Sequence, residues 1–102
     1  MFGLKSFDIE AILKVLCSYP QIDEALVFGS RAMGNYKPGS DVDIALKGTI
    51  TFDDVLAISA ELNECIPLPY KFDVIGYSLI ENQSLLDHID QYGKSLYIKS
   101  RG

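Results

Sequence analysis

Two neighbouring stretches determine the fold and function of this chain: Gly29-Ser30-Arg31-Ala32-Met33-Gly34 and, shortly after it, Ser40-Asp41-Val42-Asp43-Ile44. The first is a turn of small residues, which allows backbone N–H groups to approach a phosphate closely. The second places two carboxylates two residues apart, with one residue between them, and paired carboxylates can hold Mg²⁺. Transfer of a phosphoryl group from a nucleotide needs both features, so together they indicate a nucleotidyltransferase.

The second stretch is expected to begin a β-strand. Residues 42–46 are rich in apolar residues and follow a Gly-Ser turn signal, which is typical of a strand starting near Asp41. Side chains alternate along a strand, so Asp41 and Asp43 point to the same side with Cα atoms about 6.5–7 Å apart. Repulsion would raise the pKa of one carboxyl unless a cation lies between them. Mg²⁺, which takes oxygen ligands, suits such a site.

The turn at Gly29 is the expected phosphate-binding element. The chain contains neither a Gly-rich dinucleotide fingerprint nor the Gly-Lys-Ser/Thr of a P-loop. Gly29 would allow close backbone approach, and Ser30 would cap a short helix over residues 31–33 and donate its hydroxyl. Arg31 could reach a phosphate or a carboxylate. Gly29, Ser30 and Arg31 are therefore the candidate nucleotide-binding residues.

Gly29-Ser30, followed after ten residues by Asp41-x-Asp43, resembles the signature of the DNA polymerase beta-type nucleotidyltransferase superfamily. The longer string FGSRAMGNYKPGSDVDIAL, residues 28–46, resembles the small prokaryotic branch called minimal nucleotidyltransferases. The resemblance extends from Leu26 to about Tyr97. It implies an α/β (α+β) fold with a small mixed β-sheet flanked by helices, ATP as substrate, a two-metal Mg²⁺ site, and a HEPN-domain toxin as partner.

The superfamily also needs a third carboxylate on a neighbouring strand. Residues 70–75 form a β-rich run that carries Asp73 between apolar neighbours, a costly place for an unpaired charge. If this strand lies beside the one that bears Asp41 and Asp43, a cluster of three carboxylates results. The resemblance then implies that all three bind metal and that Asp73 orients or deprotonates the attacking hydroxyl.

By resemblance, the expected reaction transfers AMP from ATP to a hydroxyl, a tyrosine of the HEPN toxin, and releases pyrophosphate. The protein would be the antitoxin of a type VII toxin–antitoxin pair. Two alternatives remain open: a binding module that occludes the toxin without turnover, and a nucleotidyltransferase that modifies a small molecule such as an aminoglycoside. The intact carboxylates favour an enzyme over the binding module. Because the chain ends soon after the core, we expect another protein or a second copy to supply the acceptor surface, which disfavours the small-molecule enzyme.

Composition restricts the partners. Nine Lys and Arg stand against fourteen Asp and Glu, a net charge of −5, so we expect no basic face and no direct contact with nucleic acid. Cys17 and Cys65 are isolated and His88 is the single histidine, which disfavours a zinc site. His88 falls in a predicted helix, and we expect it to be a surface residue there. No apolar run reaches membrane length and no signal peptide is visible, so a cytoplasmic protein with free thiols is expected.

A single domain is expected over residues 1–102. Helices are predicted at 8–19, 52–65 and 81–92, and strands at 25–28, from near 41 to 46, at 70–75 and, as an edge strand, at 95–98. Thr51 is the predicted N-cap of the second helix. The predicted inward side chains are Ile9, Ile12, Leu13 and Leu16 in the first helix, Phe52, Val55, Leu56 and Leu62 in the second, and Leu85, Leu86 and Ile89 in the third.

Overall fold

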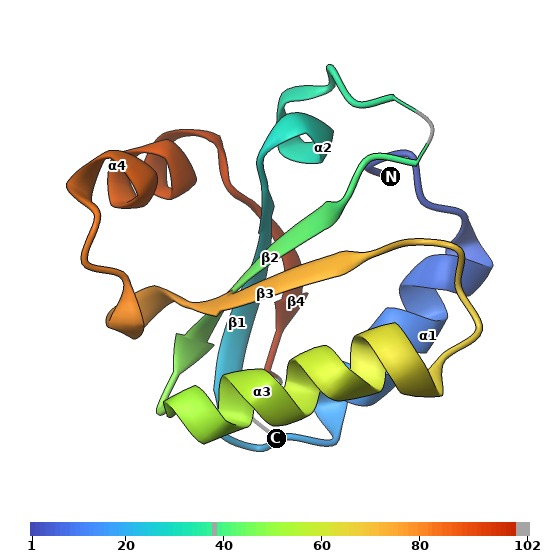
Figure 1. Cartoon of the computed structure of the whole chain (residues 1–102), viewed down its shortest axis with the longest axis horizontal. Helices are drawn as coiled ribbons and strands as arrows, with labels where there is room; N and C mark the ends of the chain where they lie inside the picture. Colours follow the sequence, from blue (N-terminus) through green and yellow to red (C-terminus); the bar gives the residue numbers. More distant parts are fainter. Residues whose placement is uncertain (38, 100–102) are drawn as a thin grey trace.

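The structure of the protein is a computed structural model that describes residues 1–37 and 39–99. A π-helical turn, Glu61–Cys65, extends the helix Phe52–Ala60, and a 3₁₀ turn, Tyr77–Leu79, follows the strand Phe72–Gly76. Each predicted helix and strand is present, with bounds that shift by at most three residues. Figure 1 shows the elements in chain order: α1 (Ser6–Cys17), β1 (Ile22–Phe28), α2 (Ser30–Met33), β2 (Val42–Gly48), α3 (Phe52–Ala60), β3 (Phe72–Gly76), α4 (Gln83–Tyr92) and β4 (Lys94–Ile98).

The four strands form one mixed sheet in the order β3-β2-β1-β4. Strand β1 is antiparallel to both of its neighbours, whereas β2 and β3 run parallel. A parallel pair needs a crossover connection, which residues 49–71 supply by way of α3. The expected α/β (α+β) architecture with a small mixed β-sheet is confirmed, and β4 is an edge strand as predicted.

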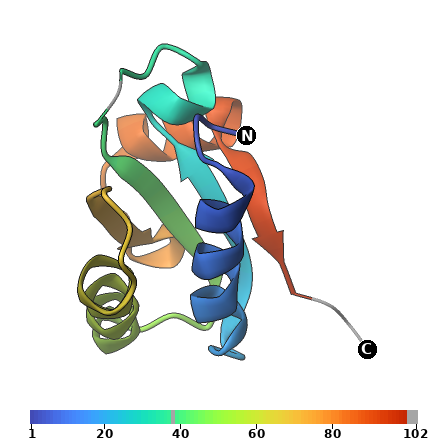
Figure 2. The same cartoon turned by 90° about the vertical axis from the view of Figure 1, so that its right-hand side faces the viewer.

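Helices cover both faces of the sheet (Figures 1 and 2). On one face, α4 packs through Ile89 against a small cluster that contains Phe28 and Ala45. Because strand side chains alternate, Asp43 lies on the same face as Ala45, the face that α4 partly covers. On the opposite face, α1 and α3 enclose the main core, whose fully buried members include Ile12, Leu16, Ile44, Leu46, Ile58 and Leu62.

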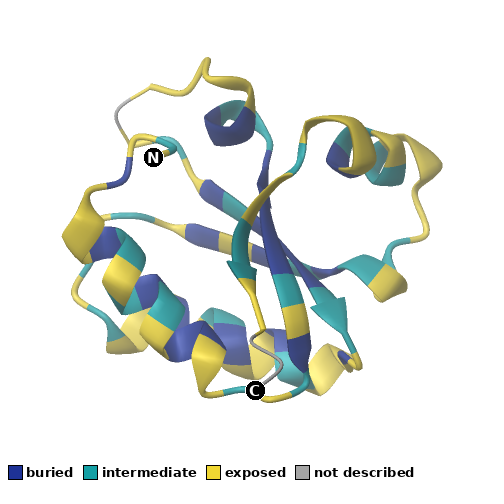
Figure 3. Ribbon diagram, turned by 180° about the vertical axis from the view of Figure 1, so that it is seen from behind, coloured by how far each residue is buried: buried dark blue, intermediate teal, exposed yellow. Residues whose placement is uncertain are grey.

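The buried stripe of α3 and its extension differs from the prediction. Val55, Ile58 and Leu62 are buried at spacings of three and four residues, as in an amphipathic helix. The side chains of Phe52 and Leu56, both predicted inward, are instead 67% and 54% exposed. Leu56 follows Val55 by about 100° around the helix, so the stripe that includes Val55 turns Leu56 toward solvent. Figure 3 shows how buried and exposed residues are distributed over the molecule as a whole.

The first and last long helices present their inner faces largely as expected. Ile12 and Leu16 of α1 and Ile89 of α4 are buried. Four further predicted positions are only partly buried: Ile9, Leu13, Leu85 and Leu86. Within residues 1–37 and 39–99, no helix has the length and apolar content needed to cross a membrane.

Capping side chains set the helix starts. The side chain of Thr51 accepts a hydrogen bond from Asp54 N at 3.2 Å, and Asp54 Oδ2 accepts one from Thr51 N at 3.0 Å, which confirms the predicted N-cap as part of a capping box. The hydrogen bond from the Thr51 backbone lowers the pKa of the Asp54 carboxyl. Helix α4 begins at Gln83, later than predicted, because Asn82 caps it by accepting from Leu85 N at 3.1 Å.

Truncation of two leucines in the same helical segment should separate core from surface. Leu62→Ala removes a side chain that is 1% exposed, and should lower the free energy of unfolding by about 2–5 kcal/mol. Leu56→Ala removes one that is 54% exposed, and should cost less than about 1 kcal/mol. Urea denaturation measures both values. Equal losses would place Leu56 in the core and contradict this packing.

Candidate active site

The parallel pairing of β2 with β3 brings the predicted carboxylates together. Asp43 and Asp73 are partners in the register, so their side chains leave the sheet on the same face. Asp41 lies two residues before Asp43, immediately ahead of β2. The strand order on which the third carboxylate depends is therefore the expected one, and the three aspartates share one end of two adjacent strands.

The environment of Asp43 reflects this arrangement. Asp41 and Asp73 are exposed, and Asp43 is half-buried. The pKa of Asp43 is raised, first by desolvation and then by repulsion from Asp73 and Asp41, while His88, only when it carries a positive charge, acts in the opposite direction. The expectation that repulsion raises the pKa of one carboxyl in the pair is confirmed at Asp43.

The donor atoms suit a hard divalent cation, although the side chains do not converge on one point. Across the described ranges 1–37 and 39–99, no group of three or more His, Cys, Asp or Glu side chains is arranged to hold a metal ion. Asp41, Asp43 and Asp73 offer only carboxylate oxygens, the ligands that Mg²⁺ prefers. A cation would also offset the repulsion that raises the pKa of Asp43. On these chemical grounds the three residues fit Mg²⁺, and their role as ligands stays a prediction.

Gly29 connects β1 to α2 and lies directly against Asp43. Its backbone has φ 72° and ψ −153°, a conformation that side-chain-bearing residues rarely adopt. A Cβ atom at this position would overlap Asp43 Oδ2. Both the backbone conformation and the space occupied by the carboxylate therefore require glycine here.

Ser30 is the first residue of α2 and not its cap. Gly29 occupies the N-cap position, and the helix ends four residues later at Gly34, a left-handed C-cap. The predicted capping role of Ser30 is wrong because the chain reaches the helix through the positive φ of Gly29, which puts the serine one position further along. Contact of Gly29 and Ser30 with phosphate stays a prediction.

Arg31 is held by backbone carbonyls. Its side chain is 4% exposed, and its guanidinium donates to Ser40 O at 2.8 and 3.2 Å and to Phe2 O at 2.8 Å. The rings of Tyr36 and Tyr70 each lie 5.2 Å from the guanidinium carbon. Arg31 therefore fixes the loop that leads into Asp41, and the expected contact with a phosphate or a carboxylate stays a prediction.

His88 is part of the site, and its prediction as a surface residue is wrong. It is half-buried, and its Nε2 accepts a hydrogen bond from Gly29 N at 3.1 Å. Its ring packs between Phe28, at 6.2 Å, and Tyr92, at 5.3 Å. The sequence contains a signal for this position, because Leu85, His88, Ile89 and Tyr92 follow the i, i+3, i+4, i+7 spacing of an inward helix stripe.

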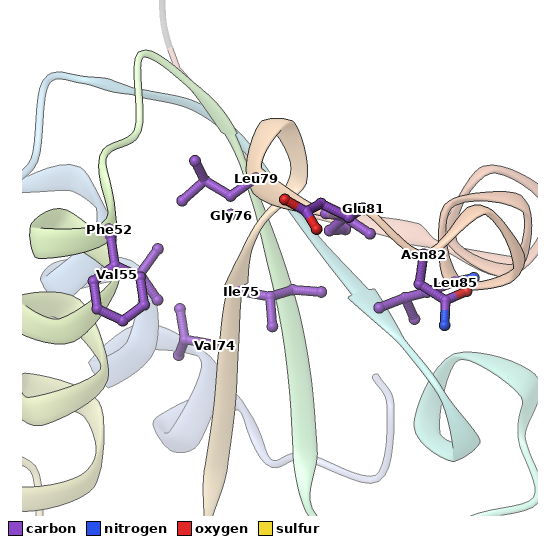
Figure 4. A pocket seen from close by; sticks show the side chains of 10 residues that line it. Phe52, Val55, Val74, Ile75, Gly76, Leu79, Glu81, Asn82 and Leu85 are labelled. Carbon is purple, nitrogen blue, oxygen red and sulfur yellow. Dashed lines mark hydrogen bonds between the residues drawn. The ribbon is translucent and has the colours of Figure 1, made fainter.

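The three aspartates lie apart from an apolar cavity beside β3. That cavity of about 360 Å³ lies between the end of β3 and the starts of α3 and α4 (Figure 4). Phe52, Val74, Leu79 and Leu85 are among its lining residues, and the three aspartates are not. Exposure of Asp41 and Asp73 leaves the carboxylates accessible to large substrates.

Residues 10–102 match the family described as polymerase beta, nucleotidyltransferase. The matched region includes the Gly29 turn and all three aspartates. A mixed sheet that presents carboxylates on two adjacent strands beside a Gly-Ser turn is thus a nucleotidyltransferase domain of the polymerase beta type. The chain belongs to this family.

A candidate protein adenylyltransferase of Methanocaldococcus jannaschii is 31% identical to this chain over 67 residues. The similar region makes up 66% of this chain and 61% of that protein, so the chain matches less than two thirds of this relative.

Solved toxin–antitoxin complexes contain chains with the same fold. A chain in the crystal structure of a toxin–antitoxin with AMP-PNP has a TM-score of 0.73 at 21% identity, over 91% of this chain and 75% of that chain. A chain in the structure of the tri-AMPylated Shewanella oneidensis HEPN toxin in complex with MNT antitoxin has a TM-score of 0.70 at 18% identity, over 94% and 74%. At these identities the similarity concerns the fold.

Asp43→Asn should stabilise the protein near neutral pH. A raised pKa means that the folded protein binds this proton more tightly than the unfolded chain, for which the value is 3.8. Stability therefore falls as pH rises above 3.8 through the pKa of folded Asp43. The substitution removes this loss, so thermal denaturation at about pH 7 should show a midpoint higher by a few degrees, and the gain should shrink below about pH 4. The exposed Asp23→Asn should show no such pH-dependent gain, and a gain independent of pH would contradict the assignment.

Gly29→Ala and Gly34→Ala should separate strain from steric overlap. Both positions have positive φ, 72° and 82°, so each substitution should lower stability by about 1–3 kcal/mol. Only Gly29→Ala introduces a Cβ that displaces the Asp43 carboxylate, because nothing lies within 4 Å of a Cβ at Gly34. Calorimetry with an ATP analogue and Mg²⁺ should show binding lost in Gly29→Ala and retained in Gly34→Ala. Equal binding by the two variants would show that the contact with Asp43 has no effect on the site.

Proposed function

We propose that this protein transfers AMP from ATP to a hydroxyl of a HEPN-domain toxin and so acts as the antitoxin of the pair. The observation that carries the proposal is the placement of Asp43 opposite Asp73 on adjacent strands, beside the Gly29 turn. The relative described as a candidate protein adenylyltransferase and the fold shared with chains of toxin–antitoxin complexes support it.

In this proposal the acceptor oxygen attacks the α-phosphorus of ATP. A bond forms between that oxygen and the α-phosphorus. The bond between the α-phosphorus and the oxygen that bridges it to the β-phosphate breaks, and pyrophosphate leaves with that oxygen. Asp73 accepts the proton of the attacking hydroxyl, and the turn at Gly29 and Ser30 binds the distal phosphates. Asp41, Asp43 and Asp73 would hold Mg²⁺, which when bound neutralises charge that develops on the phosphate oxygens.

The partner in this proposal supplies the acceptor, a tyrosine side chain. The exposure of Asp73 supports this, because a protein side chain can reach an exposed carboxylate. A net charge of −5 gives no reason to propose direct binding of nucleic acid. Cys17 and Cys65 are free and exposed, which is compatible with the cytoplasmic location that we propose.

The reaction can be tested with a co-purified HEPN partner and ATP. Asp43→Asn should abolish the mass increase of the partner, a loss of more than about 100-fold in rate, because it removes a carboxylate that would bind the metal. Asp23→Asn, an exposed aspartate on β1, is the matched control and should transfer AMP at the wild-type rate. Full transfer by Asp43→Asn would contradict the proposed role of the carboxylates.

Cell protection separates the enzyme from a binding module that only occludes the toxin. The Asp41→Ala/Asp43→Ala double variant should still bind the partner in a pull-down but should not protect cells that express it. If the bound, inactive variant protects as well as the wild type, neutralisation depends on contact and not on AMP transfer.

A further inference from the structure

We propose that His88 is a positioning residue, which holds the Gly29 turn against Asp43 in the orientation that binds a nucleoside triphosphate. The inference rests on the proposed nucleotidyltransferase function. Gly29 N–H donates to His88 Nε2 at 3.1 Å, and the two residues are 59 positions apart in sequence. The hydrogen bond therefore joins α4 to the turn between β1 and α2.

The Gly29 backbone is confined on two sides. On one side its N–H is held by His88, and on the other its Cα faces Asp43 so closely that a Cβ would overlap Oδ2. Gly29 is half-buried, and the imidazole supplies the hydrogen-bond partner of its backbone N–H. Fixing this N–H fixes the plane of the peptide bond between Phe28 and Gly29. It thereby fixes the position of the Gly29 Cα, which lies against the Asp43 carboxylate.

The imidazole is itself held in place by aromatic packing. The ring of Phe28 meets it edge to face, with a centroid distance of 6.2 Å and an interplanar angle of 76°. Tyr92, one helical turn further along α4, lies 5.3 Å from it. Since Nε2 accepts from Gly29, the proton of the neutral ring is assigned to Nδ1. A ring restrained in this way presents its acceptor to the turn in one orientation.

The helix that carries His88 is otherwise lightly attached. Among the residues that the structure describes, its side chains contact the rest of the molecule through the small cluster around Ile89 and a hydrogen bond from Tyr77 to Asp90 at 2.6 Å. A purely structural role for His88 would be to anchor α4. The two roles make different demands on the side chain: anchoring needs an aromatic ring between Phe28 and Tyr92, whereas positioning needs an acceptor at Nε2.

Two substitutions separate these demands. His88→Phe keeps the aromatic packing and removes the acceptor. His88→Gln loses the ring but places an amide oxygen near the position of Nε2. Gln91→Ala, at an exposed position of the same helix, is the control. For each variant we would measure hydrogen exchange of the Gly29 amide without nucleotide, and affinity for a non-hydrolysable ATP analogue with Mg²⁺ by calorimetry.

The wild type, His88→Gln and Gln91→Ala should protect the Gly29 amide and bind the analogue within about threefold of one another. His88→Phe should lose about tenfold in both protection and affinity, the effect of one hydrogen bond. The proposal is overturned if His88→Phe binds as the wild type does, or if His88→Gln loses as much as His88→Phe. If the wild type itself does not bind the analogue, the proposed function fails, and the exchange of the Gly29 amide still decides whether His88 holds the turn.

Discussion

The parallel pairing of β2 with β3 is the constraint on which the rest of the site depends. It sets Asp43 opposite Asp73 on strands that lie about 4.8 Å apart. Two unit charges about 5 Å apart repel by about 3 kcal/mol at an effective dielectric constant of about 20. Exposure of Asp73 to water screens this repulsion, so its actual cost is smaller, set against the roughly 5–15 kcal/mol by which a domain is stable. The sheet therefore carries an unfavourable charge pair, which packing elsewhere must offset.

That packing lies on the other face of the same two strands. Because side chains alternate, each strand that presents an aspartate to solvent also buries its neighbours: Val42 and Ile44 flank Asp43 and are 0% exposed. Phe72 and Val74 flank Asp73 and belong to the same core beneath α1 and α3. The residues that fix the strand register thus also fix the distance between the carboxylates. A shift of one residue in β3 would turn Asp73 into the core and Val74 toward the site, so register and site geometry are a single constraint.

The local parts of the site were predictable from sequence, and the long-range parts were not. The Gly29 turn and the Asp41-x-Asp43 strand are each encoded within a few residues, so turn and strand signals were sufficient to predict them. Asp73 needed the strand order, which came from the family resemblance. The partners of Arg31 could not be predicted, because backbone carbonyls carry no sequence signal. On α3, the apolar pattern of the sequence fits Phe52 and Leu56 as well as it fits Ile58. Only the orientation of the helix on the sheet determines that Ile58 is buried and the other two are exposed.

Helix α4 shows why a weakly packed element can matter to the site. The cluster that α4 forms with the sheet contains four buried residues, its own Ile89 included, against fifteen in the main core, so this helix has the smaller share of hydrophobic stabilisation. It nevertheless holds Gly29 through His88, and Gly29 limits where Asp43 can lie. A ligand that orders the turn must therefore favour the docked position of α4. Linkage is reciprocal. A partner protein that favours the docked position of α4 would raise the affinity of the turn for that ligand by the same factor by which the ligand raises the affinity for the partner. This coupling includes the hydrogen bond from Gly29 to His88 and the steric contact between Gly29 and Asp43.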